Sequence, residues 1–189
     1  MANIIFRDVS EHGPAELCKP LCEALMQHQT DRGVRYKNIL ASMCFENRLK
    51  PAFDAAERRF LYIAFDGNKP VGYIFCEGGT VTKEMKTARP DWANMFPADA
   101  GNLYPGDLPT PIVVAHLNNL YVLPEYRGQH ISSELMAKGM SWMKSIPGVE
   151  RAFVHVSNGN NAGALYEKYG FRYSHDVYNG MIDAYQLVY

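Results

Sequence analysis

The chain has 189 residues, of which 47% are hydrophobic and 21% are charged, and its formal net charge at pH 7 is −1. This length and composition suit one globular domain with a sizeable core, so we expect a single domain over residues 1–189. The balanced charge gives no sign of a basic surface, and no apolar run is long enough to span a bilayer. We therefore expect neither nucleic acid nor a membrane as a partner.

The four cysteines, at positions 18, 22, 44 and 76, indicate no disulfide framework. Cys18 and Cys22 could share a helix face, but no third or fourth metal ligand lies near them in sequence. We expect them to be small buried residues, with no metal bound. The N-terminal sequence MANIIFRDVS lacks the basic start and apolar block of a secretion signal, so we expect a cytoplasmic protein.

The first fifty residues predict one strand followed by two helices. Residues 3–9, NIIFRDV, suit a strand. Residues 14–29 carry apolar side chains at helical spacing, and Pro20 among them marks either a kink or the true start of the helix. Residues 36–50 predict the second helix.

The middle of the chain predicts a hairpin and then a long irregular segment. Residues 59–78 contain two apolar runs joined by a turn with the sequence DGN. Residues 79–110 show no clear periodicity, are interrupted by prolines and glycines, and include Trp92 and Tyr104. Such long segments in a compact domain are usually functional lids or disordered, and the aromatic residues favour an ordered lid.

Strands and helices alternate in the last third of the chain. Residues 111–124 predict a long strand, and a helix extends from the turn after Gly128 to about Ser145, where a Pro-Gly pair stops it. Residues 151–156, RAFVHV, are apolar on both faces, which predicts a central strand.

The C-terminal residues predict a helix and a closing hairpin. The helix spans 160–170, and Gly170 stands where left-handed caps occur. Residues 171–189 form the hairpin, with an Asn-Gly turn. The order of the elements predicts a mixed α/β fold with a parallel unit near its middle.

The segment LYVLPEYRGQHISSELM, residues 120–136, suggests a binding loop. A strand ends at Pro124, and a helix begins soon after Arg127 and Gly128. The N-terminus of a helix presents unpaired backbone N–H groups and the positive end of the helix dipole, and Gly128 lets a ligand approach the backbone closely. RGQHISS therefore suits a pyrophosphate. Many such turns bind nothing, so this feature alone leaves both interpretations open.

Three segments together resemble the GCN5-related N-acetyltransferase (GNAT) superfamily. Residues 120–136 are similar to its acetyl-CoA-binding strand, loop and helix, and NNAGALYEKYGF, residues 160–171, is similar to its later helix. The closing hairpin with its Asn-Gly turn is the third segment. The resemblance implies a single GNAT-like domain: a mixed, mostly antiparallel twisted sheet with a central pair of parallel, splayed strands, flanking helices, and a long loop insertion at 79–110.

Two places depart from the family pattern. The family loop usually reads Arg/Gln-x-x-Gly-x-Gly/Ala, and here Arg127 fills the first position while His130 and Ser132 replace the glycines. The His130 side chain could crowd the pyrophosphate or point outward. The family asparagine that stands seven residues before the tyrosine is replaced by Gly159, with asparagines on both sides.

The resemblance implies how acetyl-CoA would bind. The diphosphate would bind the loop at 127–133, and the pantetheine arm would lie between strands at 112–123 and 151–156. The thioester carbonyl would meet a backbone N–H near Tyr121 or Val122, a one-donor oxyanion hole. The residues expected to contact acetyl-CoA are Leu120, Tyr121, Val122, Arg127, Gly128, Gln129, His130, Ile131, Ser132, Ser133, Asn158, Asn160 and Asn161.

Two side chains are the predicted catalytic residues. The alternative for Tyr166 is an aromatic packed in the core, and the alternative for His116 is a buried histidine with satisfied hydrogen bonds or one that lines the substrate cleft. Tyr166 matches the family tyrosine that protonates the leaving thiolate, whereas Tyr169 is expected in the core. His116 stands where several family members have a glutamate base, and Asn118 shares its face unless a bulge intervenes. His155, on the neighbouring strand, is a second candidate for the base.

The resemblance places the acceptor site among roughly residues 26–50, 79–110 and 174–182. Acidic side chains near the middle segment could attract a cationic amine, namely Glu77, Glu84, Asp91, Asp99 and Asp107. The alternative is that these carboxylates only solvate the surface.

Two functions from different classes fit these residues. The first is an acetyl-CoA-dependent N-acetyltransferase that transfers the acetyl group directly to a primary amine, a small molecule being favoured over a protein amine. The second is a non-catalytic acyl-CoA-binding sensor or interaction module with the same fold. The expected partners are coenzyme A and a small amine, and a homodimer is left open.

Overall fold

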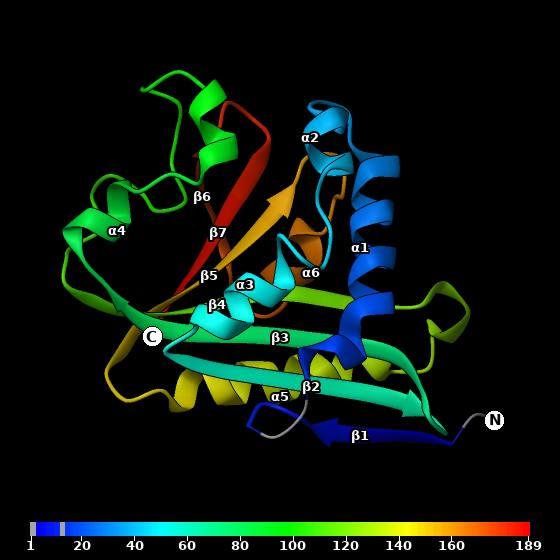
Figure 1. Cartoon of the computed structure of the whole chain (residues 1–189). Coiled ribbons are helices and arrows are strands. Elements are labelled where there is room, and N and C mark those ends of the chain that lie inside the picture. Colours follow the sequence, from blue (N-terminus) through cyan, green and yellow to red (C-terminus); the bar gives the residue numbers. More distant parts are fainter. Residues whose placement is uncertain (1–2, 12–13) are drawn as a thin grey trace.

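A computed structural model of the chain describes residues 3–11 and 14–189, and residues 1–2 and 12–13 of the predicted domain lie outside the described part. It contains a seven-stranded sheet with the order β1-β2-β3-β4-β5-β7-β6 (Figure 1). Neighbouring strands are antiparallel except β4 and β5, which run parallel. The strands are β1 (Ile4–Asp8), β2 (Arg58–Asp66), β3 (Lys69–Val81), β4 (Ile112–Val122), β5 (Val149–Ser157), β6 (Arg172–Val177) and β7 (Ile182–Val188). The predicted mixed sheet with one parallel pair is confirmed.

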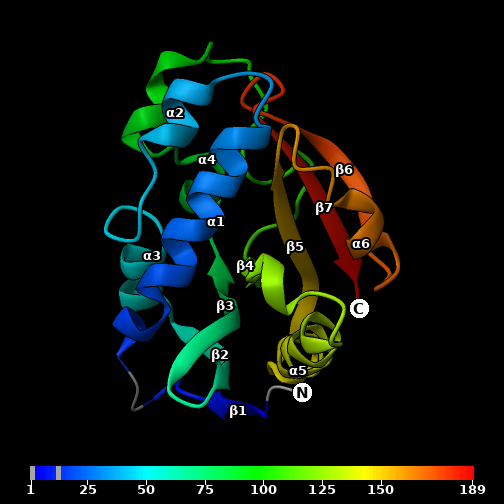
Figure 2. The ribbon, with the colours of Figure 1, turned by 90° about the vertical axis from the view of Figure 1, so that its right-hand side faces the viewer.

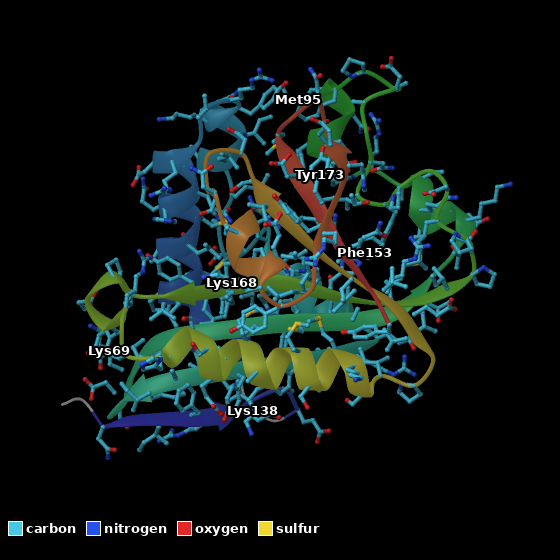
Figure 3. All side chains as sticks on the ribbon, turned by 180° about the vertical axis from the view of Figure 1, so that it is seen from behind. Lys69, Met95, Lys138, Phe153, Lys168 and Tyr173 are labelled. Carbon is cyan, nitrogen blue, oxygen red and sulfur yellow. The ribbon has the colours of Figure 1, made fainter. Side chains whose placement is uncertain are left out.

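Helices cover both faces of the sheet. Helices α1 and α3 lie on one face, and α5 lies on the other (Figures 1 and 2). Figure 3 shows α5 crossing this second face, with the exposed Lys138 on it. The helices are α1 (Lys19–Arg32), α2 (Lys37–Ala41), α3 (Leu49–Ala55), α4 (Lys83–Thr87), α5 (Ile131–Ser145) and α6 (Gly163–Glu167), with 3₁₀ turns η1 (Ala15–Cys18), η2 (Asp91–Met95) and η3 (Pro124–Tyr126).

Each face of the sheet has its own apolar core. Leu21 and Leu25 of α1 pack with Phe75 of β3 on the first face. Leu135 of α5 packs with Ile74 of β3 on the second face. Because adjacent residues of β3 point to opposite faces, this strand contributes to both cores and fixes the two layers of helices around it.

The single helix predicted at 36–50 is wrong, because two short helices, α2 and α3, stand there instead. The side chain of Asn47 explains the interruption. Its Oδ1 accepts from the backbone N–H of Cys44 at 2.8 Å, and its Nδ2 donates to the carbonyl of Ser42 at 2.8 Å. These local bonds occupy backbone groups that a continuous helix would have paired.

The segment 79–110 is ordered, and it is less irregular than predicted. Residues 79–81 extend β3, and the rest contains α4 and η2. The guanidinium of Arg89 holds the segment together, because it donates to three backbone carbonyls at 2.6–3.0 Å, those of Pro97, Ala98 and Ala100. The role of this segment as a lid stays a prediction.

Two helix boundaries follow from local chemistry. Pro20 lies in the first turn of α1, so it marks the start of the helix and not a kink. The helix predicted at 160–170 is shorter, since α6 covers only Gly163–Glu167 and Asn161 before it has a left-handed φ of +53°. Gly170 has the predicted left-handed conformation, with a φ of +92°.

The cysteine thiols bear on metal binding, and the helix lengths bear on a membrane span. All four cysteines are free thiols, and no group of three or more His, Cys, Asp or Glu side chains gathers as a metal site within residues 3–11 and 14–189. In the same described part of the chain, no helix has the length and apolar character needed to cross a bilayer.

Candidate active site

The parallel strands β4 and β5 separate part-way along their length. Their pairing runs from Val113 with Val149 to Leu117 with Val154, and beyond this point β5 pairs with β7 alone. The predicted splayed pair is present, but the gap between the strands is confined to the part of β4 after Leu117.

A β-bulge marks the start of the gap. In the register with β3, Leu117 pairs with Cys76 and Asn119 pairs with Phe75, so Asn118 is the extra residue of β4. A bulge bends its strand and increases the local twist. The bend of β4 at Asn118 therefore coincides with its separation from β5.

The backbone of β4 presents hydrogen-bond donors to this gap. The N–H of Leu123 donates to the carbonyl of Val71 on the β3 side, at 2.9 Å. Because N–H groups alternate in direction along a strand, Tyr121 also points its N–H at β3, while Leu120 and Val122 point theirs into the gap. The donors predicted for the thioester carbonyl were the N–H groups of Tyr121 and Val122, and of these only that of Val122 faces the gap. The N–H of Leu120 is a further donor that faces it.

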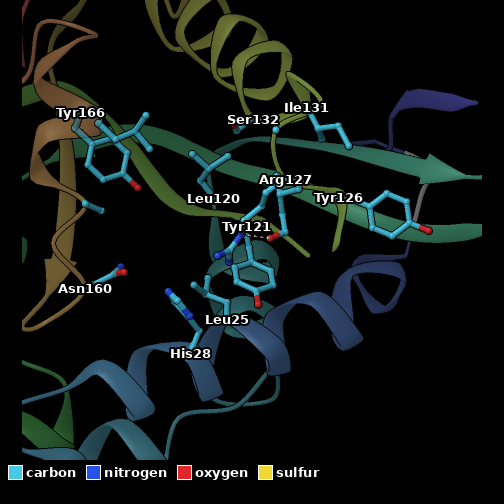
Figure 4. Close-up of a pocket in the computed structure, with 14 residues that line it drawn as sticks. Leu25, His28, Leu120, Tyr121, Tyr126, Arg127, Ile131, Ser132, Asn160 and Tyr166 are labelled. Carbon is cyan, nitrogen blue, oxygen red and sulfur yellow. Dashed lines mark hydrogen bonds between the residues drawn. The ribbon is translucent and has the colours of Figure 1, made fainter. Parts of the chain in front are cut away.

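A pocket occupies the mouth of the gap (Figure 4). Its walls are the end of β4, the loop and first turn of α5, one face of α1, and the region of α6. Among the residues predicted to bind the coenzyme, it brings together Leu120, Tyr121, Val122, Arg127, Gly128, Ile131, Ser132 and Asn160. The predicted catalytic Tyr166 lines the same pocket.

The loop before α5 borders this pocket with unpaired backbone donors. The N–H groups of Ser133 and Glu134 donate to the carbonyl of His130, whereas those of residues 128–132 have no backbone acceptor in the described part of the chain. Gly128 has a φ of +79°, and the space where its Cβ would lie is open. A helix N-terminus of this kind suits a phosphate.

Three of the predicted loop residues lie outside the pocket. Gln129, His130 and Ser133 line a separate hollow beside Ile4 and Phe6 of β1. His130 adopts a left-handed φ of +61°, so a histidine takes the conformation that glycine would adopt more easily. Its ring does not line the pocket, so it does not crowd a ligand there.

The three predicted asparagines have different surroundings. Asn160 lines the pocket (Figure 4). Asn158 is engaged elsewhere, because its Oδ1 accepts from the backbone N–H groups of Val34 at 2.9 Å and Arg35 at 2.8 Å. Asn161 is exposed and does not line the pocket. Asn160 is therefore the member of the trio best placed to contact a ligand.

Tyr166 directs a free hydroxyl into the pocket (Figure 4). The residue is 7% exposed, and its ring packs against Phe171 with 6.1 Å between centroids. Its hydroxyl makes no hydrogen bond with any described residue, and burial raises its pKa, so it is protonated at neutral pH. Tyr169 packs against the core, as expected.

Helix α1 supplies part of the pocket, which the sequence did not reveal. Leu25 and His28 line it, and the His28 ring lies 6.0 Å from that of Tyr121. The guanidinium of Arg127 lies 5.6 Å from the same ring. Burial, together with the charge of Arg127, lowers the pKa of His28. Three further lining residues were also not predicted, namely Tyr126, Ala162 and Leu165.

His116 belongs to a polar cluster beside the bulge. Its Nδ1 lies 3.8 Å from Oε1 of Glu77, and the side-chain amide of Asn118 donates to the same oxygen at 3.0 Å. The hydroxyl of Tyr104 lies 3.0 Å from Nε2 of His116. Burial raises the pKa of Tyr104, so we assign its hydroxyl as the donor and place the His116 proton on Nδ1, facing Glu77.

The environment sets the charges of this cluster. Burial, with a smaller effect from the charge of His155, lowers the pKa of His116 to about 3, so this ring is neutral at pH 7. Burial raises the pKa of Glu77, and the hydrogen bond from Asn118 opposes that rise. Glu77 pairs in register with His116, an arrangement that no sequence spacing revealed.

The family model described as "Acetyltransferase (GNAT) family" matches residues 23–171 of this chain. No curated protein sequence matches it. Three solved structures illustrate its structural similarity, and at these levels of identity they support the fold alone.

Arabidopsis thaliana NAA60 in complex with acetyl-CoA is 18% identical, with a TM-score of 0.53, covering 99% of this chain and 98% of that one. PaiA N-acetyltransferase from Thermoplasma acidophilum in complex with coenzyme A is 16% identical, with a TM-score of 0.54 and 99% of both chains covered. The NatC complex bound to Gag peptide and CoA contains a chain that is 16% identical, with a TM-score of 0.56 and 98% of both chains covered.

Proposed function

The chain belongs to the acetyltransferase (GNAT) family, and from this premise we propose that it transfers the acetyl group of acetyl-CoA to a primary amine. The observation that carries the proposal is the single pocket that joins three features. These are the backbone donors of β4, the helix N-terminus at α5 and the hydroxyl of Tyr166. Each suits a different part of an acyl-coenzyme A.

The residues of the pocket fit the coenzyme in order. The N–H groups at 128–132 would bind the diphosphate, with Ser132 adding a hydroxyl donor. The pantetheine arm would lie along the unpaired edge of β4, where Leu120 and Val122 offer donors. Arg127 supports this edge, because its Nε donates to the carbonyl of Val122 at 3.1 Å.

The chemistry follows from these positions. As the amine attacks the thioester, negative charge grows on the carbonyl oxygen, and a backbone N–H of β4 facing the gap would stabilise it. The carbon–sulfur bond then breaks. Tyr166, kept protonated by burial, would donate to the departing thiolate, a contribution made mainly in the transition state.

The attacking amine must first lose a proton. An alkylammonium has a pKa of about 10, so transfer of its proton to an imidazole with a pKa of about 3 is uphill by roughly 10 kcal/mol. His116 alone is thus a weak base at neutral pH, and its role as the base stays a prediction. The neighbouring Glu77, whose pKa is raised, is better matched.

Thiol release from acetyl-CoA, measured across polyamines, amino acids, aminoglycosides and peptides, tests this function. We expect thiol release with at least one primary amine, in step with formation of the acetylated product. Tight acetyl-CoA binding with no release on any acceptor would favour the non-catalytic acyl-CoA-binding module instead. A protein amine is the alternative acceptor, and peptides in the panel address it.

We also propose a reducing compartment such as the cytoplasm, for which the four free thiols are the support. The oligomeric state, for which a homodimer was left open, is a separate prediction that light scattering would measure.

A further inference from the structure

A second cleft lies on the α3 side of the sheet and reaches the polar cluster of Glu77 and His116. Its volume is about 310 Å³. Helix α3, the end of β3, Met85 of α4 and Tyr104 wall it. Most of the lining is apolar or small. Among the described residues, the charged side chains that line it are Glu57, which pairs with Arg58 at 2.8 Å, and Glu77.

This cleft and the coenzyme pocket lie along the same strand, β4, on either side of the point where β4 and β5 separate. Leu117 is the last residue of β4 that pairs with β5, and His116 and Asn118 flank it. Both of these side chains approach Glu77, which lies on the face covered by α3. Tyr166 packs into the core of the opposite face. The second cleft reaches β4 at His116 and the coenzyme pocket reaches it at Leu120, so the two lie on either side of the bulge at Asn118.

A different approach, between the α1–α2 connection and the β6–β7 turn, is closed by direct contacts. The Tyr36 hydroxyl donates to the carbonyl of Asn179 at 3.2 Å. Asn158, at the end of β5, accepts from two N–H groups of the α1–α2 connection. The ring of Phe96 lies 5.1 Å from that of Tyr36 and 5.5 Å from that of Tyr178. These contacts between described residues close this approach to an extended peptide.

We propose that the acceptor is a small primary amine with an apolar body, which enters through the α3–α4 cleft and places its ammonium group against Glu77. This inference rests on the proposed acetyltransferase function. The apolar walls suit a hydrocarbon body, and the Glu77 carboxylate, which forms no ion pair with a described lysine or arginine and feels the charge of Arg48 only as a smaller effect on its pKa, suits a positive charge. Glu57 at the rim is already paired with Arg58 at 2.8 Å.

The proton steps balance with Glu77 in this role. The Glu77 carboxylate takes one proton from the ammonium, leaving a neutral amine whose lone pair forms the bond to the thioester carbon. The carbon–sulfur bond breaks, and the thiolate gains a proton from Tyr166. The nitrogen loses its second proton, which passes through solvent and restores the Tyr166 hydroxyl. One proton passes from Glu77 to solvent in each turnover. His116 and Asn118 act as positioning residues for the Glu77 carboxylate.

Glu77→Gln tests the role of the carboxylate, with Glu57→Gln as the matched control from the rim of the same cleft. Phenethylamine and butylamine serve as probes, beside a hexapeptide with a free N-terminus. Glu77→Gln should lower kcat/KM for the amines by about 100-fold. The KM for acetyl-CoA should not change, and Glu57→Gln should have a small effect. Equal losses in both variants, or none, would overturn the role of Glu77.

Ala55→Trp tests the route, because Ala55 is an exposed residue of α3 that lines the cleft. Asp54→Trp, on the same helix but outside the cleft, is its control. Ala55→Trp should raise the KM for phenethylamine by roughly tenfold or more, leaving the KM for acetyl-CoA unchanged.

Preferred turnover of the hexapeptide, insensitive to Ala55→Trp, would overturn the cleft as the route while leaving the acetyltransferase function intact. Acetyl-CoA binding without turnover of any probe or any other amine would contradict the proposed function itself.

Discussion

Replacing Tyr166 with phenylalanine should slow the chemical step without damaging the fold. The substitution keeps the buried ring and its contact with Phe171 and deletes only a hydroxyl that has no partner among the described residues. General-acid contributions are typically about 10²–10⁴-fold. Because a thiolate leaves fairly well without protonation, we expect a loss of kcat near the lower end, about 100-fold.

The same geometry predicts the effect on stability. The Tyr166 hydroxyl opens onto the pocket, where water can hydrogen-bond with it, so its removal should be neutral or should slightly stabilise the fold. For a chain of this size, a gain of 1 kcal/mol raises Tm by about 2–4 °C. Tyr166→Phe should therefore melt at or slightly above the temperature of the parent, while its catalytic rate falls.

Steady-state thiol release gives kcat, calorimetry gives the affinity for acetyl-CoA, and a thermal melt gives Tm. Acetyl-CoA affinity should be almost intact. Tyr169→Phe is the control, since that ring packs against the same core without lining the pocket. If Tyr166→Phe turned over like the parent while Tyr169→Phe was impaired, the register assigned to this motif would be wrong.

Four further changes test other parts of the account. Gly128→Val should weaken acetyl-CoA binding in calorimetry while the protein stays folded, because Gly128 has a φ of +79° and borders the pocket; unchanged affinity would remove 127–133 as the diphosphate site. His130→Gly should raise the free energy of unfolding by up to about 1 kcal/mol in urea, since it relieves a left-handed histidine, and should leave acetyl-CoA affinity as it was. His116→Ala should slow turnover most near neutral pH and recover in part at high pH, where more amine is unprotonated; an unaltered pH–rate profile would exclude His116 from the reaction. Burial lowers the pKa of His155 to about 4, below its usual value of about 6.5. Between pH 4 and 6.5 the unfolded chain therefore binds more protons than the folded chain, so the free energy of unfolding falls on acidification through this range. Urea midpoints at pH 7 and 4.5 should show a loss of up to about 3 kcal/mol that His155→Gln reduces, whereas equal losses in both proteins would refute this source of acid sensitivity.

Sequence patterns predicted the helices and strands whose conformation depends mainly on residues close together in the chain. The strand-to-helix segment at 120–136 and the hairpins were predicted because apolar spacing and turn glycines act over a few residues. Pro20 left two alternatives open, and only the structure shows that α1 starts there. The break between α2 and α3 was missed because the two bonds of the Asn47 side chain depend on how its neighbours fold.

The residues of the site likewise divide into those that a short motif identifies and those whose placement depends on the fold. The loop at Gly128 and the hydroxyl of Tyr166 lie within short motifs, so sequence alone could identify them. His28 was not predicted, and Glu77 was named only as one of five carboxylates that could attract an amine. Their positions depend on α1 crossing the end of β4 and on the register of β3 with β4. The bulge at Asn118, which accompanies the opening of the gap, is also a property of paired strands.

The central claim is acetyl transfer from acetyl-CoA to an amine in the gap between β4 and β5. The most direct test incubates purified protein with acetyl-CoA and the amine panel, and follows thiol release and the acetylated amine together by mass spectrometry. The account predicts one acetylated amine for each thiol released, at a rate that Tyr166→Phe lowers. Thiol release with no acetylated amine, or equal rates for parent and Tyr166→Phe, would contradict it.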